Sequence, residues 1–383
     1  MDRNSVNILD EIVVDSPGRI NLIGGHTDYN NGYVLPAAID RKIGFRLWRN
    51  STMETCNIHS KGYNEPLHID LRKIEKSSVE WHNYLLGVIA GIQKLGHSLE
   101  GFDCEIESDL PIGSGLSSSA ALECGLASGL NALFQLGLSK LEIITLSRQA
   151  EHDFVGTKCG IMDQFSSVYG KSDHFIFLDC SNLDYKYVPA CMGPYQLLLL
   201  NTNISHRLSD GQYNSRQNEC FEAVAQIQKR YANVSSLRDV DMDILNNTKA
   251  LLSDIQYQRA LFIVQENQRV LDAVEALESK DIESLGSLLY ACHEGLRDLY
   301  DISCPELNFL VDYAKEQSFV AGARMVGGGF GGCTIHLVHE NHMETYIREI
   351  SKAYLKEFGI DLGAIPVHTS NGTTHRKLSD AAL

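Results

Sequence analysis

A glycine- and serine-rich loop between a strand-like and a helix-like segment is the feature that most constrains how this chain folds. Residues 110–121 read LPIGSGLSSSAA. The weakly alternating residues 102–108 predict an edge strand before the loop, and the leucines repeated through residues 122–133 predict a helix after it. Gly125 and Gly129, together with Ala121, keep another face of this helix small, which favours close packing against a neighbour.

The residues of this loop suit an anionic ligand. Gly113 and Gly115 let the backbone approach a ligand with no Cβ in the way. Ser117, Ser118 and Ser119 lie at the start of the predicted helix, where free N–H groups and the helix dipole attract negative charge. Their hydroxyls can bind phosphate, coordinate a metal ion or simply cap the helix. The loop lacks the Gly-Lys-Ser/Thr of a Walker A motif, and Ser118 replaces the third glycine of a dinucleotide-binding fingerprint.

A second polar constellation lies near the N-terminus, where residues 17–40 read PGRINLIGGHTDYNNGYVLPAAID. The apolar residues around Ile20 predict a short buried strand, and residues 28–32 predict a tight turn before a second extended run. Arg19, His26 and Asp28 would meet beside this turn and form a site for a polar, anionic ligand. The alternative is a hairpin with a surface ion pair.

Two carboxylates fall in apolar surroundings. Ser139 and Glu142 form a capping box, which predicts a helix that continues to Phe154. Glu151 lies on or beside the apolar stripe of this helix, and Asp163 lies in the apolar segment CGIMDQF. A carboxylate turned inward is costly unless it meets a cation or hydrogen-bond donors. The alternatives are an ion pair of Glu151 with Arg148 or with another nearby base, and a structural cap or turn former at Asp163.

A third glycine run, VGGGFGGC at residues 326–333, has five glycines in eight positions. Such a run predicts either a close approach of the backbone to another group or a hairpin turn. A last strand is expected at residues 334–338, and residues 174–178 and 195–200 predict buried strands. Beyond about residue 210 the apolar pattern is mainly helical.

Taken in order, PGRINLIGGHTDYNNG, LPIGSGLSSSAA and VGGGFGGC resemble the motifs of galactokinases, within the GHMP family of small-molecule kinases. The resemblance spans nearly the whole chain. It implies an α+β, two-lobed fold with the active site between the lobes. Residues 1–195 would form an N-terminal lobe with a mixed sheet and helices, and residues 196–383 a C-terminal α+β lobe.

The resemblance also implies roles for individual residues. Asp163 would be the catalytic base, and Arg19 would stabilise its charge and that of the transition state. Ser119 and Glu151 would bind Mg²⁺. The residues implied at the sugar are Gly25, His26, Thr27, Asp28, Gly160 and Tyr213. The residues implied at ATP are Trp81, Tyr84, Gly113, Ser114, Gly115, Leu116, Ser117, Ser118 and Ser119, although Trp81 and Tyr84 could be core aromatics.

The implied activity is transfer of the γ-phosphoryl group of MgATP to the anomeric hydroxyl of galactose, giving galactose 1-phosphate. Gly25 departs from the family pattern, because galactokinases usually carry a glutamate there, near the C6 hydroxyl of the sugar. An alternative substrate is therefore a C6-altered relative such as galacturonate, L-arabinose, fucose or 6-O-methylgalactose. Some relatives are non-catalytic sensors of galactose and ATP, but the intact residues 117–121 favour an enzyme.

The net charge indicates which partners to exclude, and the cysteines indicate the redox environment. The 383 residues carry a formal charge of −16, which argues against a nucleic-acid or anionic-membrane surface. The ten cysteines are scattered with no C-x-x-C pair, so we expect free thiols in a reducing cytosol. No signal peptide or membrane span is evident. We expect a cytoplasmic monomer that binds only its sugar and ATP.

Overall fold

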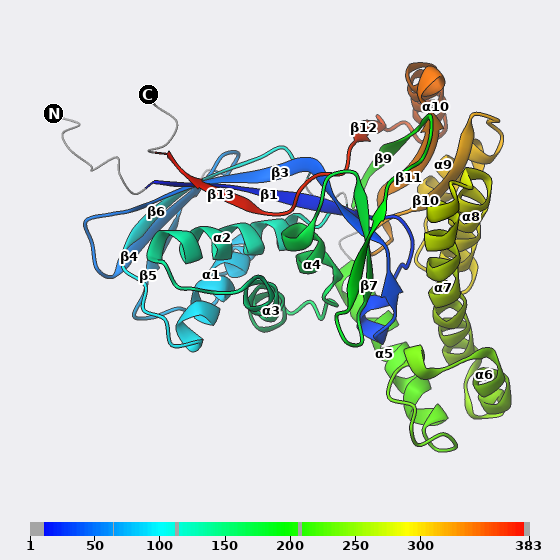
Figure 1. Cartoon of the computed structure of the whole chain (residues 1–383), viewed down its shortest axis with the longest axis horizontal. Coiled ribbons are helices and arrows are strands. Elements are labelled where there is room, and N and C mark those ends of the chain that lie inside the picture. The colour runs from blue at the N-terminus through cyan, green and yellow to red at the C-terminus, as the bar shows by residue number, and fades with distance from the viewer. Residues whose placement is uncertain (1–10, 64, 112–114, 206–208, 379–383) are drawn as a thin grey trace.

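The computed structural model describes residues 11–63, 65–111, 115–205 and 209–378, and it has the α+β fold expected from the sequence. One end of the molecule holds a six-stranded sheet with helices on one face (Figure 1). The other end holds a four-stranded sheet and a group of long helices.

The six-stranded sheet has the order β13-β1-β3-β6-β4-β5, with every pair antiparallel except β4 and β6. Its strands are β1 (Ile12–Asn21), β3 (Pro36–Arg49), β4 (Thr55–Ser60), β5 (Leu67–Asp70), β6 (Phe102–Ser108) and β13 (Thr374–Lys377). The helices on its face are α1 (Glu80–Lys94), α2 (Ser118–Phe134), α3 (Lys140–Ala150) and α4 (Met162–Tyr169).

The predicted edge position of residues 102–108 is wrong, because β6 lies between β3 and β4. Glu105 and Glu107 are exposed, whereas their neighbours Cys104 and Ile106 are buried. The weak alternation of apolar and polar residues therefore reflects a sheet with one face covered by helices and one face exposed.

Helix α2 packs closely on the sheet, as its small face predicts. A Cβ at Gly125 would overlap the ring of Phe45, and a Cβ at Gly129 would lie 2.6 Å from Leu47 Cδ1. Glycine is therefore required at both positions for the helix to lie this near β3. The close packing holds the N-terminus of α2, with its serines, at one end of the sheet.

The four-stranded sheet has the order β10-β11-β9-β12 and is antiparallel throughout. Its strands are β9 (Tyr195–Ser205), β10 (Val320–Met325), β11 (Gly331–His339) and β12 (Gly363–Val367). It packs with α8 (Ile282–Asp298), α9 (Pro305–Lys315) and α10 (Met343–Phe358). Leu198, Leu200, Tyr346 and Tyr354 belong to this second core and are fully buried.

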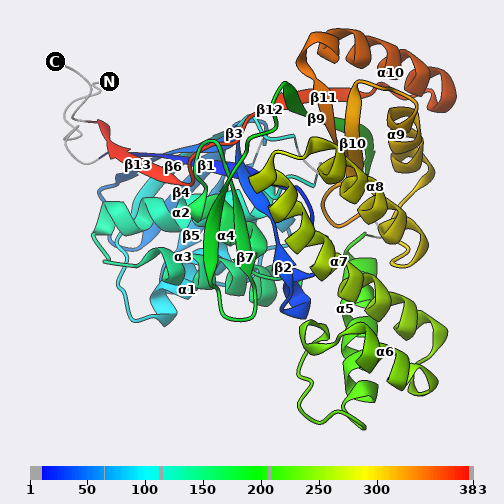
Figure 2. The ribbon, with the colours of Figure 1, turned by 45° about the vertical axis from the view of Figure 1, so that its right-hand side comes forward.

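The remaining elements connect these two parts. A small sheet with the order β2-β7-β8 contains β2 (Tyr33–Val34), β7 (His174–Asp179) and β8 (Tyr185–Pro189). The helices between β9 and β10 begin with α5 (Ser209–Ile227), α6 (Met242–Thr248) and α7 (Asp254–Ser279). Helices α5 and α6 extend away from both large sheets (Figure 2). Short helical turns are η2 (Asp28–Asn30), η3 (Glu151–Val155), η4 (Leu237–Asp239), η5 (Lys249–Leu251) and η6 (Glu340–His342).

The end of the described chain returns to its beginning. Strand β13 pairs with β1 from Ile12↔Lys377 to Asp15↔Thr374, and the two lie side by side in Figure 1. The strands expected at residues 174–178, 195–200 and 334–338 are confirmed as parts of β7, β9 and β11, and the helical region after residue 210 is confirmed too. The division of the chain near residue 195 stays a prediction.

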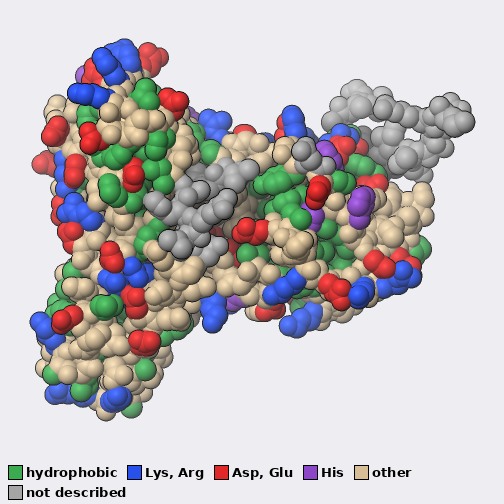
Figure 3. Space-filling model, turned by 180° about the vertical axis from the view of Figure 1, so that it is seen from behind, with side chains coloured by type: hydrophobic (Ala, Val, Ile, Leu, Met, Phe, Trp, Pro, Cys, Tyr) green, Lys and Arg blue, Asp and Glu red, His purple; other side chains and the backbone are tan. Residues whose placement is uncertain are grey.

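No helix in the described part of the chain is long and apolar enough to cross a membrane. All ten cysteines are free, and only Cys191 is exposed. On the face shown in Figure 3, the Lys and Arg side chains of the described residues are scattered among acidic ones and form no continuous patch.

Candidate active site

A cavity of about 710 Å³ brings together most of the residues predicted for the site. Residues of β1, α1, α2 and α4 line it on one side, and the segment between β10 and β11 lines it on the other. The predicted residues on its wall are Arg19, Gly25, His26, Asp28, Trp81, Tyr84, Gly115, Leu116, Ser117, Ser118, Ser119, Glu151, Asp163 and Tyr213. Thr27 and Gly160 lie outside this wall, and Gly113 and Ser114 fall outside the described residues.

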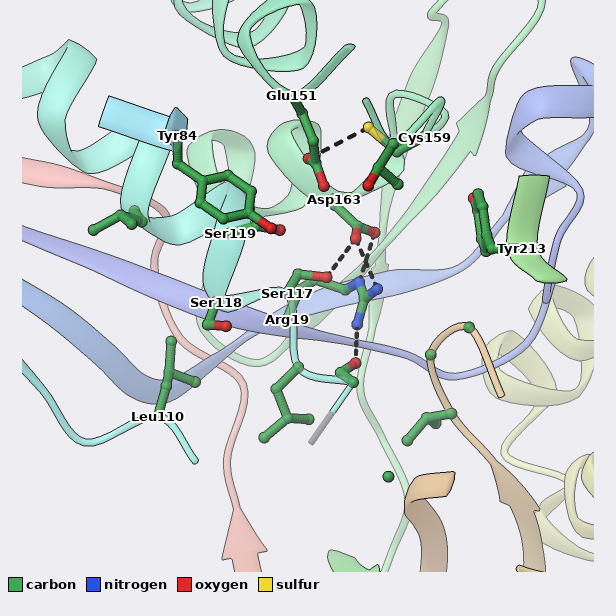
Figure 4. A pocket seen from close by; sticks show the side chains of 18 of the residues that line it. Arg19, Tyr84, Leu110, Ser117, Ser118, Ser119, Glu151, Cys159, Asp163 and Tyr213 are labelled. Carbon is green, nitrogen blue, oxygen red and sulfur yellow. Dashed lines mark hydrogen bonds and ion pairs between the residues drawn. The ribbon is translucent and has the colours of Figure 1, made fainter. Parts of the chain in front are cut away.

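Arg19 and Asp163 form a two-pronged ion pair at the centre of the cavity (Figure 4). Arg19 Nε donates to Asp163 Oδ1 at 2.8 Å, and Nη2 donates to Oδ2 at 2.9 Å. The pairing of β1 with β3 shifts between Pro17 and Arg19, and the Arg19 N–H donates to Leu116 O at 3.0 Å. A bulge of this kind redirects a side chain, and here it turns Arg19 towards the loop and α4.

The serine loop contacts the same pair. Arg19 Nη1 donates to Gly115 O at 2.6 Å, and the Ser117 hydroxyl donates to the Asp163 carboxylate. Ser117 is the N-cap residue of α2 by position, but its side chain makes no capping hydrogen bond. The simple helix-cap alternative is therefore wrong for Ser117, because its hydroxyl is engaged with Asp163. Ser118 and Ser119, which begin α2, line the cavity next to this pair (Figure 4).

The predicted helix to Phe154 is confirmed, and its last turn is the π-helical turn η3, which begins at Glu151 directly after α3. Glu151 receives hydrogen bonds from Gln164 Nε2 at 3.0 Å and from Cys159 Sγ at 3.4 Å. Burial and the nearby charge of Asp163 raise its pKa to about 7. The alternative ion pair with Arg148 is wrong, since Arg148 Nε has no hydrogen-bond partner among the described residues.

A second buried carboxylate, Glu123 on α2, lies beside this group and was missed from the sequence. Gln164 Nε2 donates to Glu123 Oε2 at 3.2 Å, and Glu123 is fully buried. Burial, followed by the charge of Glu151, raises its pKa well above the usual value. Gln164 thus holds two carboxyl groups with one amide, and the raised pKa values favour their protonated forms unless a cation is bound nearby.

The turn at η2 places a neutral histidine and a buried aspartate on the cavity wall. His26 Nδ1 and Tyr29 Oη are 2.8 Å apart, whereas His26 Nε2 is buried and has no partner among the described atoms. Burial and the charges of Arg324 and Arg216 lower the pKa of His26 to about 3. Burial and the charge of Asp163 raise the pKa of Asp28 to about 6. A Cβ on Gly160 would overlap the Asp28 carboxylate, so Gly160 leaves the space that Asp28 occupies.

The third glycine run is both a hairpin turn and a close backbone approach. It joins the antiparallel strands β10 and β11. A Cβ on Gly327 would lie 2.9 Å from Gly115 Cα, so the two glycine-rich loops touch. Gly328 faces Tyr213, whose Cδ2 would lie 3.4 Å from a Cβ there. The run therefore covers the cavity from the β10–β11 side.

Trp81 and Tyr84 line the cavity from α1. Both are partly exposed, and the Trp81 ring lies 5.0 Å from that of Tyr63. Both therefore line the cavity, and Trp81 also packs against the hydrophobic core, as the alternative expected.

Arg324 on β10 is a cavity residue that the sequence analysis missed. It is 1% exposed and lines the cavity next to the glycine run. Arg324 forms a long ion pair with Glu266 on α7. Glu266 also accepts hydrogen bonds from the N–H groups of Gly24 at 2.8 Å and Gly25 at 3.1 Å. An arginine within the apolar segment VAGARMV was the available signal, because a buried cation in a strand needs an anionic partner.

Comparisons with known proteins agree with this geometry. Three family models match: the galactokinase galactose-binding signature over residues 6–44, the GHMP kinases N terminal domain over 83–171 and the GHMP kinases C terminal domain over 273–356. The galactokinase of Thermotoga maritima is 43% identical over 359 residues, which cover 94% of this chain and 98% of that protein. This chain belongs to the galactokinase family.

Other members of the galactokinase family support the same assignment. The galactokinase of Thermosipho africanus is 41% identical over 95% of this chain and 99% of its own. The crystal structure of Lactococcus lactis galactokinase complexed with galactose matches with a TM-score of 0.92 and 34% identity, covering 96% of this chain and 95% of that one. The mevalonate kinase of Methanococcus jannaschii, at 21% identity and a TM-score of 0.63, shares the fold.

Proposed function

We propose that this member of the galactokinase family transfers the γ-phosphoryl group of ATP to the anomeric hydroxyl of a galactose-type sugar. The observation that carries the proposal is the Arg19–Asp163 ion pair, which lies in one cavity with the serine loop and with polar groups suited to a sugar. Membership of the family supplies the reaction type, and the cavity supplies the groups that the reaction needs.

ATP would bind with its phosphates at the serine loop. The N-terminus of α2 offers free N–H groups, and the glycine at 115, with φ of +74°, leaves its backbone open to the ligand. The third glycine run would close over the phosphates from the other side. Trp81 and Tyr84 would flank the base, because both line the same cavity on α1.

Mg²⁺ fits the group formed by Ser119 and Glu151. A hydrogen bond from Ser119 lowers the pKa of Glu151, which burial raises, so the two side chains are within reach of each other. Carboxylate and hydroxyl oxygens are hard ligands that suit Mg²⁺, and phosphate oxygens and water would complete its shell. No group of three or more His, Cys, Asp or Glu side chains in the described chain could hold a metal by itself. A bound Mg²⁺ supplies charge neutralisation on the transferring phosphoryl group.

Asp163 would receive the acceptor hydroxyl of the sugar. The anomeric oxygen forms a bond to the γ-phosphorus, the bond from that phosphorus to the β,γ-bridging oxygen breaks, and the hydroxyl proton passes to Asp163 as ADP leaves. Arg19 fixes both carboxylate oxygens in place and offers positive charge near the developing transition state. Ser117 holds Asp163 from the side of the phosphate loop.

The sugar would be oriented by His26, Asp28 and Tyr213. The low pKa of His26 keeps its ring neutral, and the unpaired Nε2 can hydrogen-bond a sugar hydroxyl. Asp28 is an acceptor beside Asp163, and Tyr213 covers the cavity next to the glycine run. Gly160 supports this arrangement from behind the wall by leaving room for Asp28.

The experiment that tests this proposal measures ADP release from MgATP with and without a sugar, in the unaltered chain and in Asp163→Asn. We expect sugar-dependent release, and a loss of kcat by about 10²–10⁴-fold in the variant, since a general base is removed while its shape is kept. An unchanged melting temperature would show that the variant is folded. Sugar and ATP binding without any ADP release would contradict the proposal and favour the sensor alternative. The monomeric state and the cytoplasmic location stay predictions.

A further inference from the structure

The cavity contains a buried guanidinium that faces the place of a missing side chain. Arg324 Nε donates to Met325 O at 2.7 Å, and Nη1 donates to Cys292 Sγ at 3.3 Å. Nη2 makes no hydrogen bond to any residue that the structure describes. A Cβ added to Gly25 would lie 3.7 Å from this Nη2. The free edge of the guanidinium therefore points towards position 25.

The free edge of Arg324 has no close anionic partner among the described residues. Its nearest carboxylate there is Glu266, with Nη1 and Oε1 4.0 Å apart. Glu266 is already paired with Arg269, whose Nε donates to Oε2 at 2.7 Å, and its Oε1 accepts from Gly24, Gly25 and Cys292. The charge of Asp272 also acts on Arg269, so the two guanidinium groups have two carboxylates nearby, but neither contacts Arg324 Nη2. A ligand carboxylate at Nη2 would supply this contact.

Position 25 is open for a ligand group. An added Cβ would have only ordinary contacts, at 3.4 Å and 3.6 Å to the Leu296 methyl carbons and 3.7 Å to Arg324. The φ angle of Gly25 does not fall in the left-handed region, so the backbone does not require glycine there. The absence of a side chain at position 25 therefore leaves space next to the guanidinium that the fold itself does not demand.

The space at Gly25 belongs to the same cavity as the groups assigned to the sugar. Gly25, His26 and Arg324 line this cavity together with Asp28 and Asp163. A pyranose that holds its anomeric oxygen at Asp163 and fills the cavity would direct its C5 substituent towards the space between Gly25 and Arg324.

We propose that Arg324 and the space at Gly25 form a carboxylate subsite, and that the preferred substrate is a galactose-type hexuronic acid. A planar carboxylate at the exocyclic carbon matches the free edge of the guanidinium and would give Nη2 the charged partner that Glu266 does not. A glutamate at position 25 would place its own carboxylate in this space and exclude such a substrate. The inference rests on the proposed sugar-kinase function and adds the class of sugar to it.

The test compares initial rates of ADP release with galacturonate, galactose, 6-deoxygalactose and L-arabinose at saturating MgATP. We expect kcat/KM for galacturonate to exceed that for galactose by about tenfold or more, the size of one charge-assisted hydrogen bond. Thermal shift measured with each sugar gives a readout that is independent of turnover. Galacturonate should raise the melting temperature more than galactose at equal concentration.

Two variants at position 25 separate charge from size. Gly25→Glu should reverse the preference to galactose, because its carboxylate takes the place of the substrate's. Gly25→Gln fills the same volume without the charge and should impair galacturonate less than Gly25→Glu does. Arg324→Lys keeps the charge and loses the planar fork, so it should raise KM for galacturonate more than for galactose. If Arg324→Lys fails to fold, the position-25 pair still decides the question.

The outcomes distinguish the two proposals. Galactose used as well as galacturonate, or 6-deoxygalactose or L-arabinose used best, would overturn the carboxylate subsite and leave the kinase function standing. Equal effects of Gly25→Glu and Gly25→Gln on galacturonate would also overturn it, since charge would then play no part. ADP release with none of the sugars would contradict the kinase function itself.

Discussion

At the scale of single residues, Glu151 couples the stability of the empty protein to pH. Burial and the Asp163 charge raise its pKa from 4.5 to about 7 in the folded chain. Between these values the unfolded chain has released the proton that the folded chain still holds, so stability falls as pH rises. The loss of stability caused by ionising Glu151 in the folded chain is complete above pH 7 and absent below pH 4.5. A cation bound at the ionised carboxylate would offset it.

Replacing this carboxyl group should therefore stabilise the ligand-free protein at alkaline pH. We expect Glu151→Gln to raise the free energy of unfolding at pH 8 by up to about 3 kcal/mol and to change it little at pH 4.5. Urea denaturation at the two pH values, without ATP or metal, measures the difference. The same variant should lose most of its Mg²⁺-dependent ADP release. Equal stabilisation at both pH values would contradict the assigned titration.

The residues named from the sequence and those that were missed differ in where their partners lie. Arg19, His26 and Asp163 belong to motifs whose neighbours in sequence already indicate a polar site. Arg324 belongs to an apolar segment, whereas Glu266 stands in the polar run QENQR of helix α7, so only the burial of Arg324 has a local signal. Their pairing joins strand β10 to helix α7 across the fold and exists only in the tertiary structure.

At the scale of elements, α8 and β10 pack backbone against backbone. A Cβ on Gly286 would overlap the carbonyl group of Ala321, and one on Gly322 would lie 2.5 Å from Gly286 Cα. This contact positions β10, which presents Arg324 and leads into the third glycine run. The packing of α8 on β10 at Gly286 and Gly322 therefore helps to set the position of the cavity residue Arg324.

A single methyl group at this contact should be destabilising. We expect Gly286→Ala to lower the free energy of unfolding by about 1–3 kcal/mol, because backbone cannot yield as a flexible side chain does. Chemical denaturation measures the loss. Gly211→Ala is the matched control, since Gly211 is a helical glycine with none of the described residues near its Cβ position. It should leave stability unchanged or raise it by up to about 1 kcal/mol.

Most elements follow from local pattern, and the exceptions have physical causes. The Ser139 capping box starts α3 as predicted, with both reciprocal hydrogen bonds present. The same helix ends in the π-helical turn at Glu151, whose side chain accepts hydrogen bonds from Gln164 and Cys159 outside the helix. The edge assignment of β6 fails because pairing order depends on the distant strand β4. Neither the π-helical turn nor the position of β6 in the sheet has a signal in the neighbouring sequence.

At the scale of the whole molecule, the C-terminal segment ties together the two elements that carry the central ion pair. The Thr373 N–H donates to Ser167 O at 2.7 Å on α4, and the Gly372 N–H donates to Gly170 O at 2.8 Å. The hydroxyls of Thr373 and Ser16 on β1 are 3.0 Å apart. Strand β1 holds Arg19 and α4 holds Asp163, so residues far away in sequence brace both partners.

Removing this segment should weaken the protein and its activity together. We expect truncation after Thr369 to cost more than about 4 kcal/mol of stability, because it removes the whole of β13 as well as the bonds of Gly372 and Thr373, at about 0.5–1.5 kcal/mol for each lost hydrogen bond. The milder variant Thr373→Val should cost about 1 kcal/mol. Melting temperature and sugar-dependent ADP release measure both effects. A truncated chain with unaltered stability and kcat would contradict the bracing role.

The pairing of β13 with β1 also sets an order in time. During synthesis β1, which carries Arg19, leaves the ribosome early. Its outer edge can pair with β13 only after the residues near 377 have been made. All the side chains that would perform the chemistry are therefore synthesised before the strand that borders them. A nascent chain halted in its last few dozen residues carries a complete set of catalytic groups on an unfinished sheet, and its exposed edge is open to pairing with other chains. Premature termination near the end should for this reason be seen first as aggregation.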